Sequence, residues 1–163
     1  MIRPTARSWR LATLVLLAVL AVDQLTKILV RSGVEQGSSD PIFPALKLVH
    51  VENRGVAFGA FAGGGQTLVI IVIVIALGGL LAYFATHADQ PGVWLPTGLL
   101  IGGALGNIID RVVLGAVTDF LKLPSWPAFN VADIAITLGV IALLVVVERN
   151  DRDDEEAIEA DAA

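Results

Sequence analysis

The chain has 163 residues, of which 55% are hydrophobic and 17% are charged, and its mean hydropathy is +0.76. This balance excludes an ordinary soluble domain and predicts an integral membrane protein. The formal net charge of −5 comes from residues 151–163, which carry seven acidic side chains and one basic one. The near-neutral remainder gives no indication of nucleic-acid binding. The absence of cysteine excludes a disulfide, a thiol nucleophile and a thiolate metal site.

Four apolar segments are long enough to cross a bilayer, which takes about 20 residues of helix. Their expected limits are 11–30, 66–86, 94–112 and 130–148. The first segment follows a basic cluster, as a secretory signal would, but no small-residue cleavage site follows it, so we expect a retained anchor. The spans therefore predict a four-helix membrane domain over residues 1–150. The acidic tail, 151–163, lacks aromatic residues and is expected to be disordered and cytoplasmic.

The orientation is predicted from the basic residues near the first span. Arg3, Arg7 and Arg10 precede it, and such clusters mark the cytoplasmic side of a membrane. Because four spans put both ends of the chain on one side, we expect both termini in the cytoplasm. The full count is less one-sided, with five basic residues inside and six outside. In this orientation the connections 31–65 and 113–129 share the outer face.

These outer connections contain the candidates for structure other than helix. Leu46–Val51 is rich in apolar and β-branched residues, and Asn53-Arg54-Gly55 follows it, which indicates a strand and a turn. Val117–Leu123 is a second, weaker strand candidate. The loop after it contains Pro124 and Pro127, which stop a helix from continuing and favour a chain that folds back.

The residues needed by several hydrolase classes are missing or misplaced. All five serines lie outside the expected spans, and no Gly-x-Ser-x-Gly sequence occurs. The two histidines, His50 and His87, form no His-Glu-x-x-His pair, and no phosphate-binding Gly-x-x-x-x-Gly-Lys loop is present. The polar residues at the ends of the spans are carboxylates and amides, namely Asp23, Asn53, Asn107, Asp110, Asp119, Asn130 and Asp133.

Asp119 and Asp133 stand out in this set, because one follows the third span and the other lies at the start of the fourth. Charged groups near hydrocarbon are costly, so an ionisable residue there is a functional candidate by default. Two close carboxylates can share one proton and hydrolyse an amide. The ionised member takes a proton from water, and its protonated partner donates to the carbonyl. A loop that folds back would bring the two together.

Each candidate also has a structural interpretation. Asn130 is a plausible N-cap of the fourth helix with Asp133 at its third position. Asn107 and Asp110 share a helix face and would pair with each other or with a basic side chain such as Arg111. Asp23 and Lys27, four residues apart, are expected to form a structural ion pair. Asn53-Arg54-Gly55 is explained most simply as a turn.

Taken together, five strings of this sequence resemble those of the bacterial lipoprotein signal peptidases, or signal peptidase II. The resemblance extends over nearly the whole of residues 1–150. The strings occur in the same order along the chain, which makes the match far more specific than any one of them. They are Asp23-Gln-Leu-Thr-Lys27, Asn53-Arg-Gly-Val-Ala-Phe-Gly59, Gly106-Asn-Ile-Ile-Asp-Arg111, Val117-Thr-Asp-Phe120 and Phe129-Asn-Val-Ala-Asp133.

The resemblance implies four transmembrane helices with a small extracytoplasmic β-rich platform, in the bacterial cytoplasmic membrane. It implies an intramembrane aspartyl peptidase that cuts diacylglyceryl-modified prolipoproteins just before the lipidated cysteine. The implied partners are these prolipoproteins and membrane lipid. Asp119 and Asp133 occupy the catalytic positions. No metal or cofactor is implied, and the oligomeric state is left open. The positions that surround the dyad and the substrate are those of Asn53, Gly55, Asn107, Asp110, Arg111 and Asn130.

Two functions from other classes compete with this one. Membrane carboxylates also build proton relays, so a small proton-coupled transporter or channel subunit is the alternative. The sequence has no evident inverted repeat or pair of broken helices, which argues against that class. In a scaffold protein, the same carboxylates would only pair with basic residues such as Lys27 and Arg111.

Overall fold

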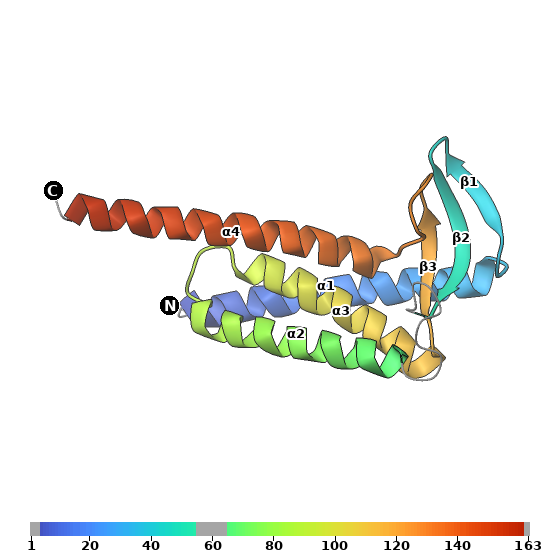
Figure 1. The fold of residues 1–163 in the computed structure, drawn as a ribbon, viewed down its shortest axis with the longest axis horizontal. Helices are drawn as coiled ribbons and strands as arrows, with labels where there is room; N and C mark the ends of the chain where they lie inside the picture. The colour runs from blue at the N-terminus through green and yellow to red at the C-terminus, as the bar shows by residue number, and fades with distance from the viewer. Residues whose placement is uncertain (1–3, 55–64, 162–163) are drawn as a thin grey trace.

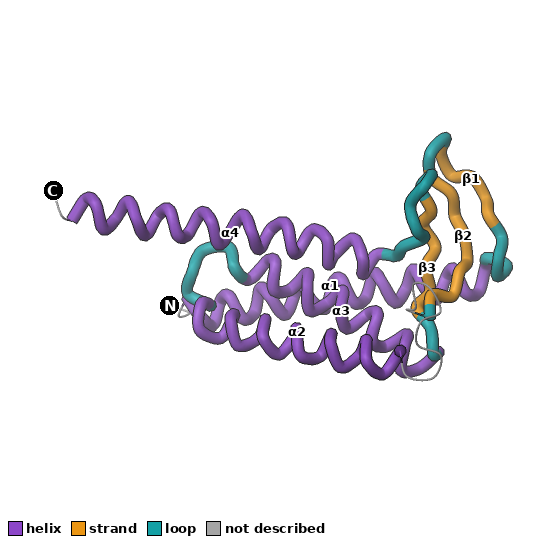
Figure 2. The backbone as a smooth tube through the Cα atoms, viewed as in Figure 1, coloured by secondary structure: helices purple, strands orange, loops and turns teal. Residues whose placement is uncertain are grey.

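The computed structural model describes residues 4–54 and 65–161. Within these residues the chain forms a bundle of four helices with a three-stranded sheet at one end, as Figures 1 and 2 show. The elements in chain order are α1 (Pro4–Gly33), β1 (Ser39–Phe43), β2 (Leu46–Asn53), α2 (Gly65–His87), α3 (Trp94–Leu114), β3 (Val117–Lys122) and α4 (Val131–Asp161).

All four described helices are long and apolar enough to cross a membrane, so the predicted spans are confirmed. The helices differ in how much of each span is covered by protein. Half of the span in α3 is buried, against 17% in α1 and α4 and 6% in α2. The central helix is therefore α3, and most of the surface of α2 is apolar and exposed. Such a surface suits lipid, where apolar side chains need no burial against protein.

Glycines on α3 let its neighbours approach closely. A Cβ atom at Gly98, Gly102 or Gly106 would lie 2.5–2.9 Å from atoms of α1. A Cβ atom at Gly103 would lie 2.6 Å from the backbone oxygen of Ala132 in α4. In lipid, where helices gain nothing from hiding apolar surface, such close contact supplies packing energy directly. The glycines of the third span thus make α1, α3 and α4 one tightly packed unit.

The sheet has the antiparallel order β1-β2-β3, and its register brings Val51 of β2 opposite Asp119 of β3. Gly115 turns the chain from α3 into β3. Its φ is +76°, a left-handed conformation that glycine adopts without strain, and its N–H donates to the Arg111 oxygen at 3.2 Å. The two predicted strands are confirmed as β2 and β3.

Strand β1 was not predicted. Its sequence, Ser39-Asp-Pro-Ile-Phe43, resembles a turn because Asp-Pro usually starts one. Pro41 has no N–H to donate, but β1 is an edge strand of the described sheet and needs hydrogen bonds on one side only.

The loop after β3 folds back as predicted. The Trp126 N–H donates to the Leu123 oxygen at 3.3 Å, closing a turn with Pro124 and Ser125 at its centre. Phe129 then pairs with Leu121 through two N–H···O bonds of 2.9 Å. This return places the start of α4 beside β3.

The acidic tail is expected to be disordered, and here the structure differs: α4 continues as a helix to Asp161. Alanine and glutamate, which are strong helix formers, are frequent in this segment. Ion pairs at i and i+4 add to this, since Arg152 contacts Glu148 at 2.5 Å and Arg149 contacts Asp153 at 3.8 Å.

Replacing Gly106 with alanine tests the packing of α1 against α3. The new methyl group would lie 2.5 Å from the Asp23 Oδ2 atom, so either the buried Asp23 side chain or one of the two helices must shift. We expect a loss of about 1–3 kcal/mol, which is typical of overpacking, and a lower thermal midpoint in detergent. Gly78→Ala is the matched control, because a Cβ atom there meets nothing within 4 Å. An equal effect of both substitutions would contradict the packing role of Gly106.

Candidate active site

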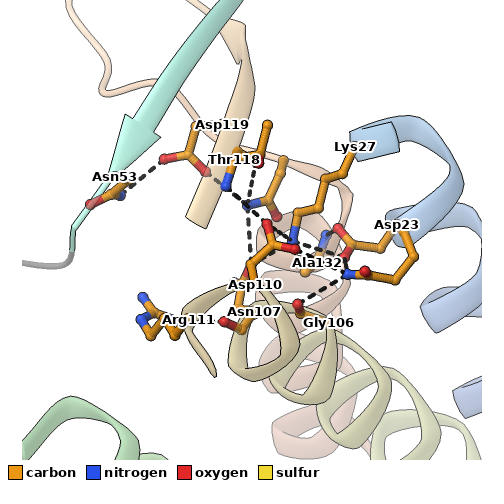
Figure 3. A network of polar contacts seen from close by, with 12 residues as sticks. Asp23, Lys27, Asn53, Gly106, Asn107, Asp110, Arg111, Thr118, Asp119 and Ala132 are labelled. Carbon is orange, nitrogen blue, oxygen red and sulfur yellow. Dashed lines mark hydrogen bonds and ion pairs between the residues drawn. The ribbon is translucent and has the colours of Figure 1, made fainter. Parts of the chain in front are cut away.

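Asp119 lies in β3 with only 2% of its surface exposed, and both of its carboxylate oxygens accept hydrogen bonds from amides. The Asn53 Nδ2 atom donates to Oδ2 at 2.9 Å, and the Asn130 Nδ2 atom donates to Oδ1 at 2.8 Å. Figure 3 shows Asn53 reaching Asp119 from the neighbouring strand. Asn53 and Asp119 are diagonal neighbours on one face of the sheet, because Val51 is the residue directly opposite Asp119.

Asp133 lies in the first turn of α4 and is half-buried. Its Oδ1 atom accepts from the Asn107 Nδ2 atom at 2.8 Å, and its Oδ2 atom accepts from the Asn130 N–H at 3.2 Å. The Asp133 N–H in turn donates to the Asn130 Oδ1 atom at 3.0 Å. This reciprocal pair is a capping box, so the predicted capping role of both residues is confirmed.

Asn130 therefore connects the two carboxylates. Its side chain donates to Asp119, and its backbone and side chain bond Asp133, the N3 residue of the helix that Asn130 caps. Asn130 is completely buried, so this link is shielded from water. The loop that folds back after β3 puts Asn130 there. Capping and the pairing of the carboxylates are thus two consequences of one local structure.

Burial raises the pKa of Asp119 from 3.8 to about 6. The hydrogen bonds from Asn53 and Asn130 and the charge of Lys27 act in the opposite direction, whereas the charge of Asp133 adds to the increase. The net result is a carboxyl group that is protonated in mildly acidic solution. Such a group can act as a general acid beside an ionised partner.

A second layer of charge lies behind the amides and is centred on Lys27, as seen in Figure 3. The Lys27 Nζ atom is 2.9 Å from Asp23, 3.4 Å from Asp110 and 3.0 Å from the Asn107 Oδ1 atom. The predicted Asp23–Lys27 pair is present, with both side chains wholly buried. Asp23 also accepts the Ala132 N–H at 2.9 Å, which ties α1 to the start of α4.

Asp110 pairs with the basic side chains of Lys27 and Arg31, which is the second of the two alternatives that its helix face suggests. Its Oδ2 atom accepts the Thr118 N–H of β3 at 2.9 Å. Three residues of this layer were not singled out from the sequence: Gln24, Arg31 and Thr118. Arg31 follows Lys27 by one helical turn, and that spacing would have indicated it. Gln24 and Thr118 lie within the strings that resemble those of the signal peptidases, but nothing in the sequence indicated their partners.

Arg111 lies at the edge of the site. Its Nη1 atom donates to the Asn107 oxygen at 3.2 Å, and it faces a large cavity that Asn107 and Asp133 also line. Gly55 falls outside the described residues. Among those that the structure describes, no group of three or more histidine or acidic side chains is arranged to hold a metal ion.

The cavity has a volume of about 1210 Å³ and runs between α2, α3 and α4. Apolar side chains form most of its wall. Asp133 lies at the end near the sheet, and Glu148 and Asp151 lie near its opposite end. This cavity, called the groove below, therefore has the shape and polarity to hold an apolar helix next to one member of the carboxylate pair.

Four membrane-spanning helices and two amide-bound carboxylates beside an apolar groove, one of them buried, are the features of a membrane-embedded peptidase. The model of the signal peptidase (SPase) II family matches residues 15–148, and the chain belongs to that family.

The curated relatives include lipoprotein signal peptidases from several bacteria. That of Moorella thermoacetica is 44% identical over 131 residues, covering 80% of this chain and 87% of the relative. That of Halothermothrix orenii is 38% identical over 140 residues, covering 85% and 96%. That of Paraburkholderia phymatum is 44% identical over 137 residues, covering 80% and 82%. The chain is thus a lipoprotein signal peptidase by family, and its relatives lend no support to the transporter alternative.

Two solved structures, each described as a bacterial membrane enzyme, share the fold. One has a TM-score of 0.78 and 31% identity, covering 87% of this chain and 90% of the solved chain. The other has a TM-score of 0.73 and 32% identity, covering 83% and 91%. The fold predicted from the resemblance, four helices and a small sheet, is confirmed.

The pKa of Asp119 can be tested by substituting Asn53. The carboxyl carbon of Asp119, followed by ¹³C NMR and assigned with Asp119→Asn, should titrate with a midpoint of about 6. Asn53→Ala removes a donor that favours the charged form, so the midpoint should rise. Because the folded pKa already exceeds the unfolded one, ionisation of Asp119 opposes folding. The contribution of the protonated Asp119 carboxyl group to the free energy of unfolding is fully present below pH 3.8 and disappears as the pH rises through 6.

Glu52→Gln provides the control for this titration. Glu52 is adjacent to Asn53 but points to the opposite face of the sheet, where it pairs with exposed Arg54. Solvent screens its charge, so the Asp119 midpoint should move little. A midpoint that falls in Asn53→Ala, or that moves equally in both variants, would be inconsistent with the hydrogen bond as described.

Proposed function

We propose that Asp119 and Asp133 are the catalytic dyad with which this signal peptidase II cleaves diacylglyceryl-modified prolipoproteins. The cut falls just before the lipidated cysteine and releases the signal peptide. The observation that carries the proposal is the pair of hydrogen bonds that Asn130 makes, one to each carboxylate, at the end of the apolar groove.

The surroundings of the two carboxylates suggest different roles. Asp119 is buried with a raised pKa and suits the protonated member of the pair. Asp133 faces the groove, where water and a peptide bond would meet, and the Asn130 N–H and the dipole of the α4 N-terminus stabilise its negative charge. Asp133 therefore acts as the general base and Asp119 as the general acid in the first step.

In that step Asp133 takes a proton from water as the water oxygen attacks the scissile carbonyl carbon. Asp119 gives its proton to the carbonyl oxygen, which forms a neutral tetrahedral intermediate. Asp133 then passes its proton to the leaving nitrogen, and the carbon–nitrogen bond breaks. Asp119 recovers a proton from the intermediate's hydroxyl as the new carboxyl group forms, which restores the starting state.

The groove suits the signal peptide of the substrate. Asp133 and Asp151 are 18 residues apart on α4, or about 27 Å of helix at 1.5 Å per residue. This is close to the thickness of the bilayer hydrocarbon, about 30 Å. A signal-peptide helix lying along α2 and α4 would place its last residues beside Asp133. The exposed apolar surface of α2 would allow lipid-embedded substrate to approach from the side.

The same arrangement supports an active site near the extracytoplasmic face. Both ends of the chain lie at the end of the bundle that is remote from the sheet, as Figure 1 shows. With the arginine cluster of the N-terminus in the cytoplasm, the sheet and the dyad are on the outer side. The lipidated cysteine of a prolipoprotein lies on that side of the membrane, next to the lipid that carries its acyl chains.

Substituting either dyad residue tests the proposed chemistry. Asp119→Asn and Asp133→Asn should each lower cleavage of a lipidated precursor by at least about 100-fold, since each removes a proton-transfer group. Each variant should remain folded in detergent, losing about one hydrogen bond where an amide N–H₂ replaces an accepting oxygen. The measurement is the release of signal peptide by purified enzyme.

Asp40→Asn is the matched control, because Asp40 is exposed on β1 and takes no part in the site. It should cleave at the wild-type rate. Full activity in either dyad variant would disprove the assignment. A stable but inactive protein in both cases would separate a catalytic pair from a scaffold's structural charges.

The groove can be tested with two adjacent glycines of α2. Gly79 lines the cavity, Gly78 does not, and a Cβ atom at either position meets nothing within 4 Å. Phenylalanine at position 79 would fill part of the groove and should raise KM about tenfold or more with a smaller change in kcat. Gly78→Phe should leave both constants near wild type. Equal KM values in the two variants would argue that the signal peptide binds elsewhere.

A further inference from the structure

Two of the amides around the dyad, those of Asn107 and Asn130, can each point in only one direction. An asparagine side chain presents an oxygen on one side and an N–H₂ group on the other, and these are distinguished by their hydrogen-bond partners. In this site the partner that decides is a group that can only donate. For Asn130 that group is the Asp133 backbone N–H, which must face Oδ1. The Asn130 Nδ2 atom is consequently directed at Asp119.

For Asn107 the deciding group is Lys27. An ammonium group has three N–H bonds and accepts none, and Nζ has three acceptors within reach, on Asp23, Asp110 and Asn107. The Asn107 Oδ1 atom must therefore face Lys27, which it does at 3.0 Å. The Asn130 Nδ2 atom donates to the same oxygen at 3.1 Å and favours the same orientation. The Asn107 N–H₂ group is left facing Asp133, at 2.8 Å.

From this geometry we infer that Lys27 is a positioning residue, which acts through Asn107 to hold a hydrogen-bond donor on the Oδ1 atom of Asp133. The inference rests on the proposed role of Asp133. With the amide of Asn107 reversed, its oxygen would face the carboxylate and repel it, while its N–H₂ group would face the ammonium. The buried charge of Lys27 makes that reversed state costly, because charge–dipole interactions are strong where water is excluded.

Lys27 has no exposed surface, and it is not among the described residues that line the cavity. It therefore cannot contact a substrate lying in the groove. A positioning role predicts that loss of Lys27 lowers kcat and leaves KM almost unchanged. A residue that merely stabilised the fold would reduce the amount of active enzyme without a defined dependence on Asn107.

The experiment is a double-mutant cycle in a background that removes one of the two buried carboxylates beside Lys27. Lys27→Met alone would leave two carboxylates facing one another, so every variant carries Asp23→Asn. On that background, kcat and KM are measured for Lys27→Met, Asn107→Leu and the combination of both. We expect each change to lower kcat by about 10- to 100-fold, with KM within about twofold.

The combination should be no slower than Asn107→Leu alone, because both changes remove the same donor from Asp133. If the two reductions in kcat multiply in the combined variant, the inference is overturned, since Lys27 would then act independently of Asn107. An increase in KM with unchanged kcat would also overturn it. Thermal unfolding in detergent gives the fraction of folded enzyme by which each rate is divided.

Asn107→Asp in the wild-type background keeps the proposal falsifiable if the Lys27 variants do not fold. The new carboxylate keeps an acceptor for Lys27 but has no N–H to offer Asp133, so kcat should fall as in Asn107→Leu. Wild-type kcat in Asn107→Asp would refute the need for that donor. The dyad variants are assayed in parallel to distinguish the two proposals. Activity in Asp133→Asn would contradict the proposed catalytic role of Asp133. Independent effects of Lys27→Met and Asn107→Leu would contradict only the role of Lys27.

Discussion

The buried ammonium of Lys27 is the interaction on which the site depends. Taking an ammonium ion out of water costs several kcal/mol, and the cost is offset only if carboxylates and hydrogen bonds surround it closely. Asp23 and Asp110 supply this from α1 and α3. Their remaining lone pairs accept backbone N–H groups of α4 and β3. One buried charge thereby fixes the relative positions of the elements that supply residues to the candidate site, except β2.

Neutral amides separate this charge from the two candidate catalytic carboxylates. A cation in direct contact with Asp119 would stabilise its ionised form and remove the proton that a general acid needs. Amide donors hold the carboxylate in place with a weaker effect on its protonation, so burial prevails and the pKa stays near 6. The charge of Lys27 lowers that pKa less than either amide hydrogen bond does. The charged residues around Lys27 therefore set the geometry of the site, and burial sets the protonation of Asp119.

Much of this could be predicted from the sequence, and the limits have physical causes. The spans follow from the length of apolar segments, and the Asp119–Asp133 pairing follows from the prolines of the intervening loop. The long-range partners of the Gln24 and Thr118 side chains were not accessible, because Gln24 bonds Gly106 and Asp110, and Arg31 bonds the Thr118 hydroxyl, across 82 to 87 positions. Which face of α1 meets α3 depends on glycine packing, which hydropathy does not reveal. Strand β1 was not predicted because its Asp-Pro pair is typical of a turn and not of a strand.

In the proposed function, the contacts that stabilise the bundle and the wall that admits the substrate lie on different helices. Glycine contacts and the charge network join α1, α3 and α4, and these contacts do not involve α2. Only 6% of the α2 span is buried, and yet α2 forms one wall of the groove. A substrate anchored in lipid has to reach a peptidase sideways, through a wall that is packed loosely enough to leave space. If α2 were packed as tightly as α3, the groove would close, and the proposed dyad would be well ordered but out of reach of the substrate.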